Sequence, residues 1–346
     1  MKKTPFYIFL LLSACSWSQT TYLHCGQVFD SEKAKMLGPH TLVIEGEKIK
    51  EVKKGFIEAE EGTTVVDLKT KTVYPGFIDM HVHIEGEYSP DRYLKVFQNN
   101  PADTAFEAAE IATRTLMAGF TSVRDLGGSG VNISLRNAIN KGLTSGPRIF
   151  TAGKAIGTTG GHADPTNGFR ADFQGDPGPK EGVVNSVEDA RKAIRQRYKN
   201  GADWIKITAT GGVLSVAKSG QNPQFTNEEL AAITQTARDY GFQVAAHAHG
   251  DEGMYRAVAN GVKTIEHGTL IEERTMKLMK EKEAYLVATI SAGKFVAEQA
   301  KKPGAYPAII VPKAIAIGAQ IQKTFGKAYK FGVPIAFGTD AGVYPH

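Results

Sequence analysis

Two histidines of the sequence have a spacing that suits metal chemistry. His81 and His83 stand at alternate positions of an otherwise apolar stretch, "FIDMHVHIEG" (residues 77–86). A β-strand directs successive side chains to opposite faces, so both imidazoles point to the same side. Imidazole is the commonest metal ligand, and the pair therefore predicts a metal site. Two rings satisfied by ordinary hydrogen bonds are the alternative.

Four further candidate ligands follow, each near the end of a predicted strand. They are Lys206 in "WIKITATGG", His247 in "VAAHAHG", His267 in "IEHGT" and Asp340 in "FGTDAG". A buried ammonium is costly, but a neutral lysine can take up carbon dioxide and become a carbamate, an oxygen ligand able to bridge two metals. His249 shares a strand face with His247 and is the alternative ligand or its supporting neighbour. Each residue alone could be structural; six together favour one shared metal site.

The elements that must position these residues repeat as strand, glycine-rich loop and helix after Pro75. Eight apolar segments end in small or polar residues, the first at 76–84 and the last at 334–342. One of the helices between them begins at Thr226, where Glu229 completes a capping box. Eight units over about 270 residues predict an α/β fold, a (β/α)8 barrel of TIM type, with an open doubly wound sheet as the alternative. A barrel carries its chemistry at the carboxyl ends of its strands, where the candidate ligands stand.

The stretch before Pro75 has a different pattern. Residues 21–74 contain short β-branched or alternating segments and no helical period. We therefore expect two domains, a small β-sandwich domain over residues 21–74 and a barrel over residues 75–346.

The first twenty residues, "MKKTPFYIFLLLSACSWSQT", have the layout of an export signal: a basic start, a short apolar run and small residues. Their ending "LSAC" resembles a bacterial lipobox, in which Cys15 would carry a lipid and anchor the protein to the membrane. Cleavage after the small-residue pattern Ser16-Trp17-Ser18 is the alternative. Either way we expect an exported protein, periplasmic or a membrane-anchored lipoprotein. Only Cys25 would remain, so no internal disulfide is expected.

Composition excludes few functions. The chain has 346 residues, of which 42% are hydrophobic and 22% are charged, a globular balance. Its formal charge of +5 comes from 41 basic and 36 acidic residues without a long basic run. We therefore expect no nucleic-acid partner and no polybasic membrane patch, and the sequence gives no oligomeric state.

From Thr21 onward the sequence resembles the amidohydrolase superfamily, whose binuclear metal pattern matches all six candidate positions. The resemblance implies that His81, His83 and Asp340 hold the buried metal and that His247 and His267 hold the more exposed one. Carboxylated Lys206 would bridge the two. The phrases "YPGFIDMHVH", "TSVRDLGG", "IKITATGGVLS" and "FGTDAGVYPH" resemble the imidazolonepropionase-related branch, which includes prolidase-like dipeptidases and N-acyl amino acid hydrolases.

This resemblance implies a hydrolase of carbon–nitrogen bonds. Two divalent ions, zinc by the donor types, would lower the pKa of a bridging water, and the hydroxide would attack an amide carbonyl. Asp340 would take the proton of the water and deliver it to the leaving nitrogen. His162, in "TTGGHADPTNG", would bind the carbonyl or the substrate's carboxylate, or else order its loop. The expected small-molecule substrate is a dipeptide of the Xaa-Pro type or an N-acyl amino acid.

Two other functions stay open at this point. A cyclic-amide hydrolase of the same superfamily would keep Lys206, and a catalytically silent lipoprotein could bind metal or a small ligand on the same barrel. Arg124 and Asp125, at the end of the second strand, are expected to form a structural pair, with contact to the substrate as the alternative. The sequence stops after the predicted eighth strand, where relatives continue through strands that complete the small domain, so we expect that this complement is missing.

Overall fold

The computed structural model describes residues 20–346, which fall into two compact units, one that ends at Pro75 and one that spans Gly76–His346. The predicted export signal, with Cys15, lies outside the described residues. No helix among residues 20–346 is long and apolar enough to cross a membrane.

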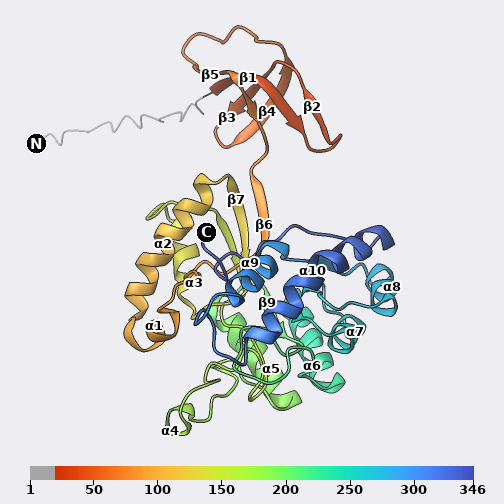
Figure 1. Cartoon of the computed structure of the whole chain (residues 1–346). Helices are drawn as coiled ribbons and strands as arrows, with labels where there is room; N and C mark the ends of the chain where they lie inside the picture. The colour runs from red at the N-terminus through yellow and green to blue at the C-terminus, as the bar shows by residue number, and fades with distance from the viewer. Residues whose placement is uncertain (1–19) are drawn as a thin grey trace, which may run out of the picture. The chain divides into compact units, whose positions relative to one another are not determined.

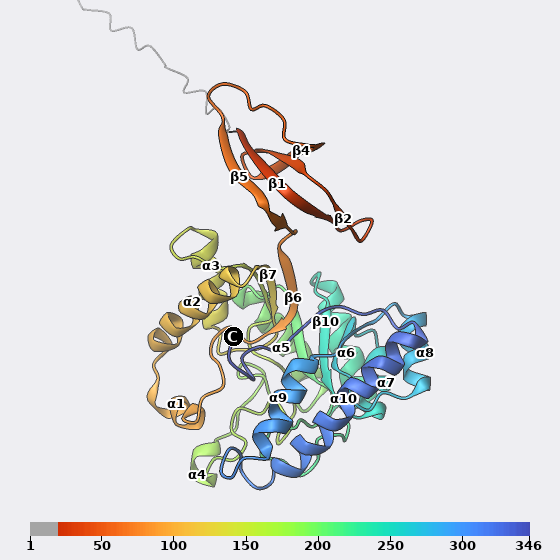
Figure 2. The ribbon, with the colours of Figure 1, turned by 45° about the horizontal axis from the view of Figure 1, so that its top comes forward.

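The first unit is a small β domain made of one five-stranded sheet (Figures 1 and 2). Its central strand, β1, pairs antiparallel with β2 and β3, β3 pairs with β4, and β5 runs parallel to β1. Cys25, Val28 and Leu42 form the buried centre of the sheet. The strands are β1 (Thr20–Asp30), β2 (Lys35–Leu37), β3 (His40–Glu45), β4 (Lys48–Lys54) and β5 (Thr64–Val73).

The second unit is built on parallel strands in two sheets, β6-β7-β8 and β12-β11-β10-β9. A bridge between Ile156 and Ile207 joins the two sheets on one side. The strands are β6 (Phe77–Val82), β7 (Phe120–Asp125), β8 (Arg148–Thr151), β9 (Ile205–Thr208), β10 (Val244–Ala248), β11 (Thr264–His267) and β12 (Tyr285–Val287).

The predicted eighth strand is an irregular segment that closes the ring on the other side. Leu286 N–H donates to Pro334 O at 2.8 Å, and Asp340 N–H donates to His81 O at 2.7 Å, so the segment lies between β12 and β6. Its backbone cannot stay extended, because Asp340 has a left-handed φ of 59° and Gly342 a φ of 106°. The predicted (β/α)8 barrel is confirmed, in a distorted form.

Ten helices of this unit connect the strands and lie around them (Figures 1 and 2). The predicted capping box is present at the start of α6, where Thr226 Oγ1 accepts from Glu229 N–H and the Glu229 carboxylate accepts from Thr226 N–H. The helices are α1 (Arg92–Gln98), α2 (Pro101–Met117), α3 (Val131–Asn140), α4 (Ala171–Gln174), α5 (Val187–Asn200), α6 (Asn227–Asp239), α7 (Asp251–Ala259), α8 (Glu273–Glu281), α9 (Ile290–Ala300) and α10 (Val311–Phe331).

Helical spacing of apolar residues explains how these helices hold the strands. Leu230, Ile233 and Ala237 recur on one face of α6 and are buried against Ile205 and Ile207 of β9 in one core cluster. Each fully buried leucine or isoleucine side chain contributes roughly 1.5–3 kcal/mol. This packing holds the carboxyl ends of the strands in fixed positions relative to one another.

Candidate active site

One cavity of about 1190 Å³ lies at the carboxyl ends of the barrel strands. It brings together all seven residues for which the sequence predicts a role in the site, although those residues come from six different parts of the barrel. The residues that line it include His81, His83, His162, Lys206, His247, His267 and Asp340.

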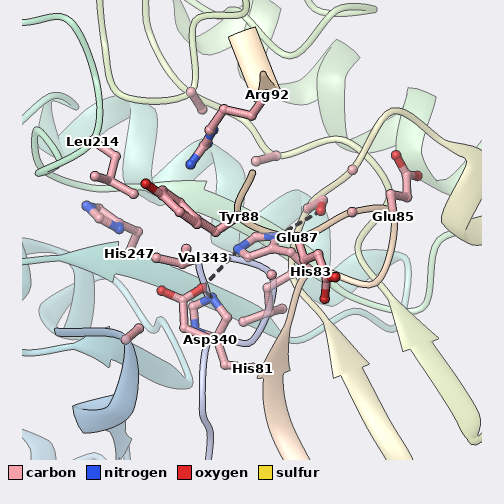
Figure 3. A pocket seen from close by; sticks show the side chains of 18 of the residues that line it. His81, His83, Glu85, Glu87, Tyr88, Arg92, Leu214, His247, Asp340 and Val343 are labelled. Carbon is pink, nitrogen blue, oxygen red and sulfur yellow. Dashed lines mark hydrogen bonds and ion pairs between the residues drawn. The ribbon is translucent and has the colours of Figure 1, made fainter. Parts of the chain in front are cut away.

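The tightest group in the cavity consists of His81, His267 and Asp340. Each offers one ligand atom, and the three atoms lie within 4.8 Å of one another. Asp340 Oδ1 is 3.4 Å from His81 Nε2 and 3.3 Å from His83 Nε2. Figure 3 shows the carboxylate of Asp340 directed at both rings of the His-x-His pair. The predicted common face of His81 and His83 is therefore present.

Unpartnered atoms show what this group can hold. His81 Nε2 and Asp340 Oδ1 are both buried, and neither makes a hydrogen bond within residues 20–346. A buried polar atom without a partner costs about 1–3 kcal/mol. Imidazole nitrogens and carboxylate oxygens that converge on one point are the donor set of zinc and similar divalent ions. The residues present therefore fit a metal site.

The outer nitrogens of the histidines are held so that the inner ones face the cavity. His83 Nδ1 donates to Gly127 O at 2.9 Å, and because a carbonyl can only accept, its Nε2 is left as a lone-pair donor for a metal. His81 Nδ1 lies 2.8 Å from Glu266 Oε2, and His267 Nδ1 lies 2.7 Å from Thr289 Oγ1. These contacts fix the orientation of the rings.

Backbone strain accompanies the same residues. His267, Thr289 and Asp340 have left-handed φ values of 72°, 48° and 59°. Such φ values are uncommon outside glycine and cost of order 1–3 kcal/mol each. The strands thus turn sharply at their ends, which aims the His267 and Asp340 side chains at the cavity instead of along the strand faces.

A buried ion pair behind His81 was missed by the sequence reasoning. Glu266 Oε1 accepts from Arg124 Nη2 at 2.8 Å, and both side chains are almost fully buried. Arg124 also donates to Met80 O at 2.7 Å and stacks over the Trp204 ring. The signal was present in "VRD" and "IEH", where a charged residue interrupts each apolar strand.

The predicted pair of Arg124 and Asp125 is wrong. Successive residues of β7 point to opposite faces, so Arg124 is free to meet Glu266 across the barrel. Asp125 accepts from Ile84 N–H and from the side-chain amide of Asn132 instead, which ties the end of β6 to α3.

Burial and neighbouring charges set the protonation states. Burial alone would raise the pKa of Glu266, but Arg124 and His81 outweigh it and lower that pKa to about 2. Burial, with the charge of Lys206, lowers the pKa of His81 to about 4. Burial also lowers the pKa of Lys206 to about 8. The site therefore combines ionised Glu266 with a neutral imidazole at His81.

His162, His247 and His249 form a second cluster of rings beside His267. The His162 and His247 ring centroids are 4.2 Å apart, and the His247 and His267 centroids are 4.7 Å apart. His247 Nε2 lies 3.2 Å from Gly211 O, whereas His249 Nδ1 lies 2.9 Å from Thr269 Oγ1. Both histidines line the cavity, and the choice of His247 as the ligand stays a prediction.

Other charged residues that line the cavity differ in whether they are paired. Lys95 pairs with Glu107, and Arg114 pairs with Glu87. Arg92 has no carboxylate partner among the described residues, and Figure 3 shows its side chain directed toward Tyr88 and the cavity. The sequence reasoning missed Arg92, because its place in α1 gives no sign that it faces the site.

Comparisons with known proteins agree with this geometry. The chain is 32% identical over 309 residues to the ochratoxinase of Aspergillus niger, a match that covers 84% of this chain and 61% of the ochratoxinase. The chain thus spans about three fifths of the length of the curated relatives it first matches.

Solved structures resemble it more closely. The crystal structure of a Xaa-Pro dipeptidase with methionine bound in the active site is 52% identical, with a TM-score of 0.92 over 95% of this chain and 81% of that one. A prolidase complexed with N-methylphosphonate-L-proline is 35% identical, with a TM-score of 0.81 over 93% of this chain and 79% of that one. The model of the amidohydrolase family matches residues 72–345, and the chain belongs to that family.

Proposed function

We propose that the protein is a metal-dependent hydrolase of carbon–nitrogen bonds that cleaves a dipeptide of the Xaa-Pro type or an N-acyl amino acid. The observation that carries this proposal is the convergence of His81, His267 and Asp340, whose ligand atoms lie within 4.8 Å in the cavity. The similarity to a Xaa-Pro dipeptidase and to a prolidase supports the substrate class.

Six residues would hold two divalent ions, most suitably zinc. His81, His83 and Asp340 would hold one ion and His247 and His267 the other, with Lys206 between them as the carbamate that its amine forms with carbon dioxide. When bound, such ions supply a water of lowered pKa as the nucleophile and polarise the carbonyl that it attacks.

Asp340 is the residue that moves the proton. Burial alone would raise its pKa, but the adjacent His81 and His83 outweigh it and lower the pKa, so the carboxylate is ionised at neutral pH. Its Oδ1 has no hydrogen-bond donor within the described residues and can accept the proton of the attacking water. The same oxygen then returns the proton to the leaving nitrogen.

Asp79 keeps Asp340 in place. Its carboxylate accepts from the N–H groups of His81 at 3.0 Å and Thr339 at 3.1 Å, and from the Thr339 hydroxyl at 2.5 Å. One buried side chain thus ties the ligand end of β6 to the segment that carries Asp340.

The remaining groups bind the substrate. The guanidinium of Arg92, which has no carboxylate partner among the described residues, would hold the substrate carboxylate by charge-assisted hydrogen bonds. Burial lowers the pKa of His162 to about 3, and this neutral ring, which lines the cavity, would bind the carbonyl or the carboxylate. Leu214, Val296 and Ile317 line the cavity and would contact an apolar side chain of the substrate.

The test is a screen of zinc-loaded chain, prepared with bicarbonate, against Xaa-Pro dipeptides and N-acyl amino acids, with release of the free amine measured. Turnover that falls in Asp340→Asn would support the proposal. Folded, zinc-loaded chain that cleaves neither class would contradict it. Export, with a lipid on Cys15 or with simple cleavage, remains a separate proposal that cell fractionation of a Cys15→Ala variant tests.

A further inference from the structure

The long loop between β9 and α6 forms one wall of the cavity. It leaves the barrel at Gly211 and returns at Asn222, where Gly211 N–H donates to Asn222 O at 3.0 Å. Between these points Val213 and Leu214 line the cavity. Figure 3 shows Leu214 beside His247, facing the same space.

Lys313, in the first turn of α10, binds this loop through its ammonium group. Lys313 Nζ donates to Gly212 O at 3.1 Å, to Ser215 O at 2.8 Å and to Ala217 O at 2.8 Å. An ammonium has three hydrogens, so these three carbonyls account for all its donors. No other lysine of the described residues donates to three main-chain carbonyls.

Lys313 lies at a position where the helix itself disfavours a positive charge. The first turn of a helix carries the positive end of the helix dipole, where a cation is unfavourable. Burial lowers the pKa of Lys313, and no carboxylate pairs with it among residues 20–346. The carbonyl oxygens of the loop therefore supply the partial negative charge that stabilises its ammonium group.

The loop in turn touches the histidine cluster. The His162 ring packs so closely on Gly212 that a Cβ there would lie 2.2 Å from its Nδ1. Gly211 O lies 3.2 Å from His247 Nε2. The main chain that Lys313 holds is thus the surface against which His162 and His247 are placed.

Apolar contacts reinforce the same arrangement. Val213 is buried with Tyr306, Ile310, Ala314 and Ile317 in one cluster, which joins the loop to α10. This cluster holds the loop against α10. It does not determine the exact position of each loop residue along α10, because apolar contacts are not directional. Hydrogen bonds from Lys313 to Gly212 and Ala217 set where each loop residue lies.

We propose that Lys313 is a positioning residue that fixes residues 211–217 as the substrate-facing wall of the site. This inference rests on the proposed hydrolase function for its kinetic consequence, but not for its structural one. Loss of the ammonium frees the loop, so substrate binding weakens, while the group of His81, His267 and Asp340 and the proton transfer by Asp340 stay intact.

The test compares Lys313→Met and Lys313→Arg with the control Lys327→Met, which removes an exposed lysine of α10 that makes no hydrogen bond or ion pair within the described residues. Hydrogen exchange of residues 210–224 is measured on the zinc-loaded full chain, beside KM and kcat for the dipeptide Met-Pro. In Lys313→Met we expect exchange of this segment to rise about tenfold, since local contacts set local opening.

KM for Met-Pro is expected to rise about tenfold in Lys313→Met with kcat changed less than about twofold, the pattern of lost uniform binding. Lys313→Arg should restore most of both effects, and Lys327→Met should change neither.

Wild-type exchange of residues 210–224 in Lys313→Met overturns the inference, as does raised exchange with an unchanged KM. If exchange rises in Lys313→Met but the wild type does not cleave Met-Pro, the positioning role is supported and the proposed dipeptidase function is not. Failure of the positioning role and failure of the proposed function therefore give different results.

Discussion

His81 Nδ1 lies 2.8 Å from Glu266 Oε2, and both residues are fully buried. This contact directs the opposite nitrogen, His81 Nε2, toward Asp340 and the cavity. Arg124 compensates the charge of Glu266 from behind, with 2.8 Å between Nη2 and Oε1. A chain of three buried side chains therefore orients one candidate metal ligand.

Replacing Glu266 by glutamine should weaken both metal binding and the fold. Outer partners of metal-binding histidines are worth about 10–100-fold in affinity, so zinc affinity should fall by that factor. Arg124 would lose its buried counter-charge, which should lower the free energy of unfolding by about 3–5 kcal/mol. Chelator competition and urea unfolding measure the two effects.

The matched control for that change is Glu252→Gln. Glu252 pairs with Arg256 and Arg274, and the three side chains are 44%, 35% and 49% exposed, so each pair should contribute at most about 1 kcal/mol. Zinc affinity that is the same in Glu266→Gln and Glu252→Gln would refute the orienting role of Glu266.

The metal-free chain should lose stability in acid. Burial lowers the pKa of His81 to about 4, of His162 to about 3 and of His249 to about 4, from an ordinary 6.5. Below pH 6.5 the unfolded chain binds protons that these folded rings refuse, so stability falls as the pH decreases toward 4. His83 opposes this trend, because Asp340 raises its pKa against the effect of burial.

Glu266 extends the same trend to lower pH. Its folded pKa of about 2 lies below the ordinary 4.5, so its contribution is present above pH 4.5 and is lost as the pH falls toward 2. The urea midpoint of metal-free chain should therefore be lower at pH 5 than at pH 7, and lower again at pH 3.5. A urea midpoint that is constant from pH 7 to pH 5 would show that the buried imidazole rings bind protons as readily in the folded chain as in the unfolded one, which would contradict the prediction.

Arg92→Met should impair binding of substrates that carry a free carboxylate. A hydrogen bond to a charged group is worth about 1.5–3 kcal/mol, so KM for an N-acyl amino acid should rise roughly 10–100-fold. The same acyl compound with its carboxylate converted to an amide is the internal control, because it has no charge for Arg92 to bind. Equal changes in KM for the acid and the amide would rule out Arg92 as the carboxylate site.

Strand periodicity explains which parts of the site the sequence could predict. His81 of β6 and His83, just beyond the end of β6, share a face because side chains alternate along an extended chain. Lys206, His247 and His267 lie at one end because parallel strands end together. These relations are local to each strand or follow from the barrel, so reading the sequence was enough to bring them into one cavity.

The sequence alone could not predict features that depend on long-range contacts or on backbone conformation. Arg124 and Glu266 are 142 positions apart, and no local pattern pairs them. The irregular path of residues 334–342 depends on the left-handed backbone of Asp340, which the apolar pattern of the segment hides. Lys313 is a basic residue in an amphipathic helix, and only tertiary packing reveals its contacts with the carbonyls of Gly212 and Ala217.

The most direct test of the central claim is the zinc content of the folded chain prepared with zinc and bicarbonate, beside a Lys206→Ala variant. Elemental analysis should give about two zinc ions per wild-type chain and about one or fewer in the variant, since the carbamate of Lys206 is proposed to join the two ions. A folded wild-type chain without bound zinc, or a variant that keeps two ions, would contradict the proposed carbamate-bridged hydrolase site.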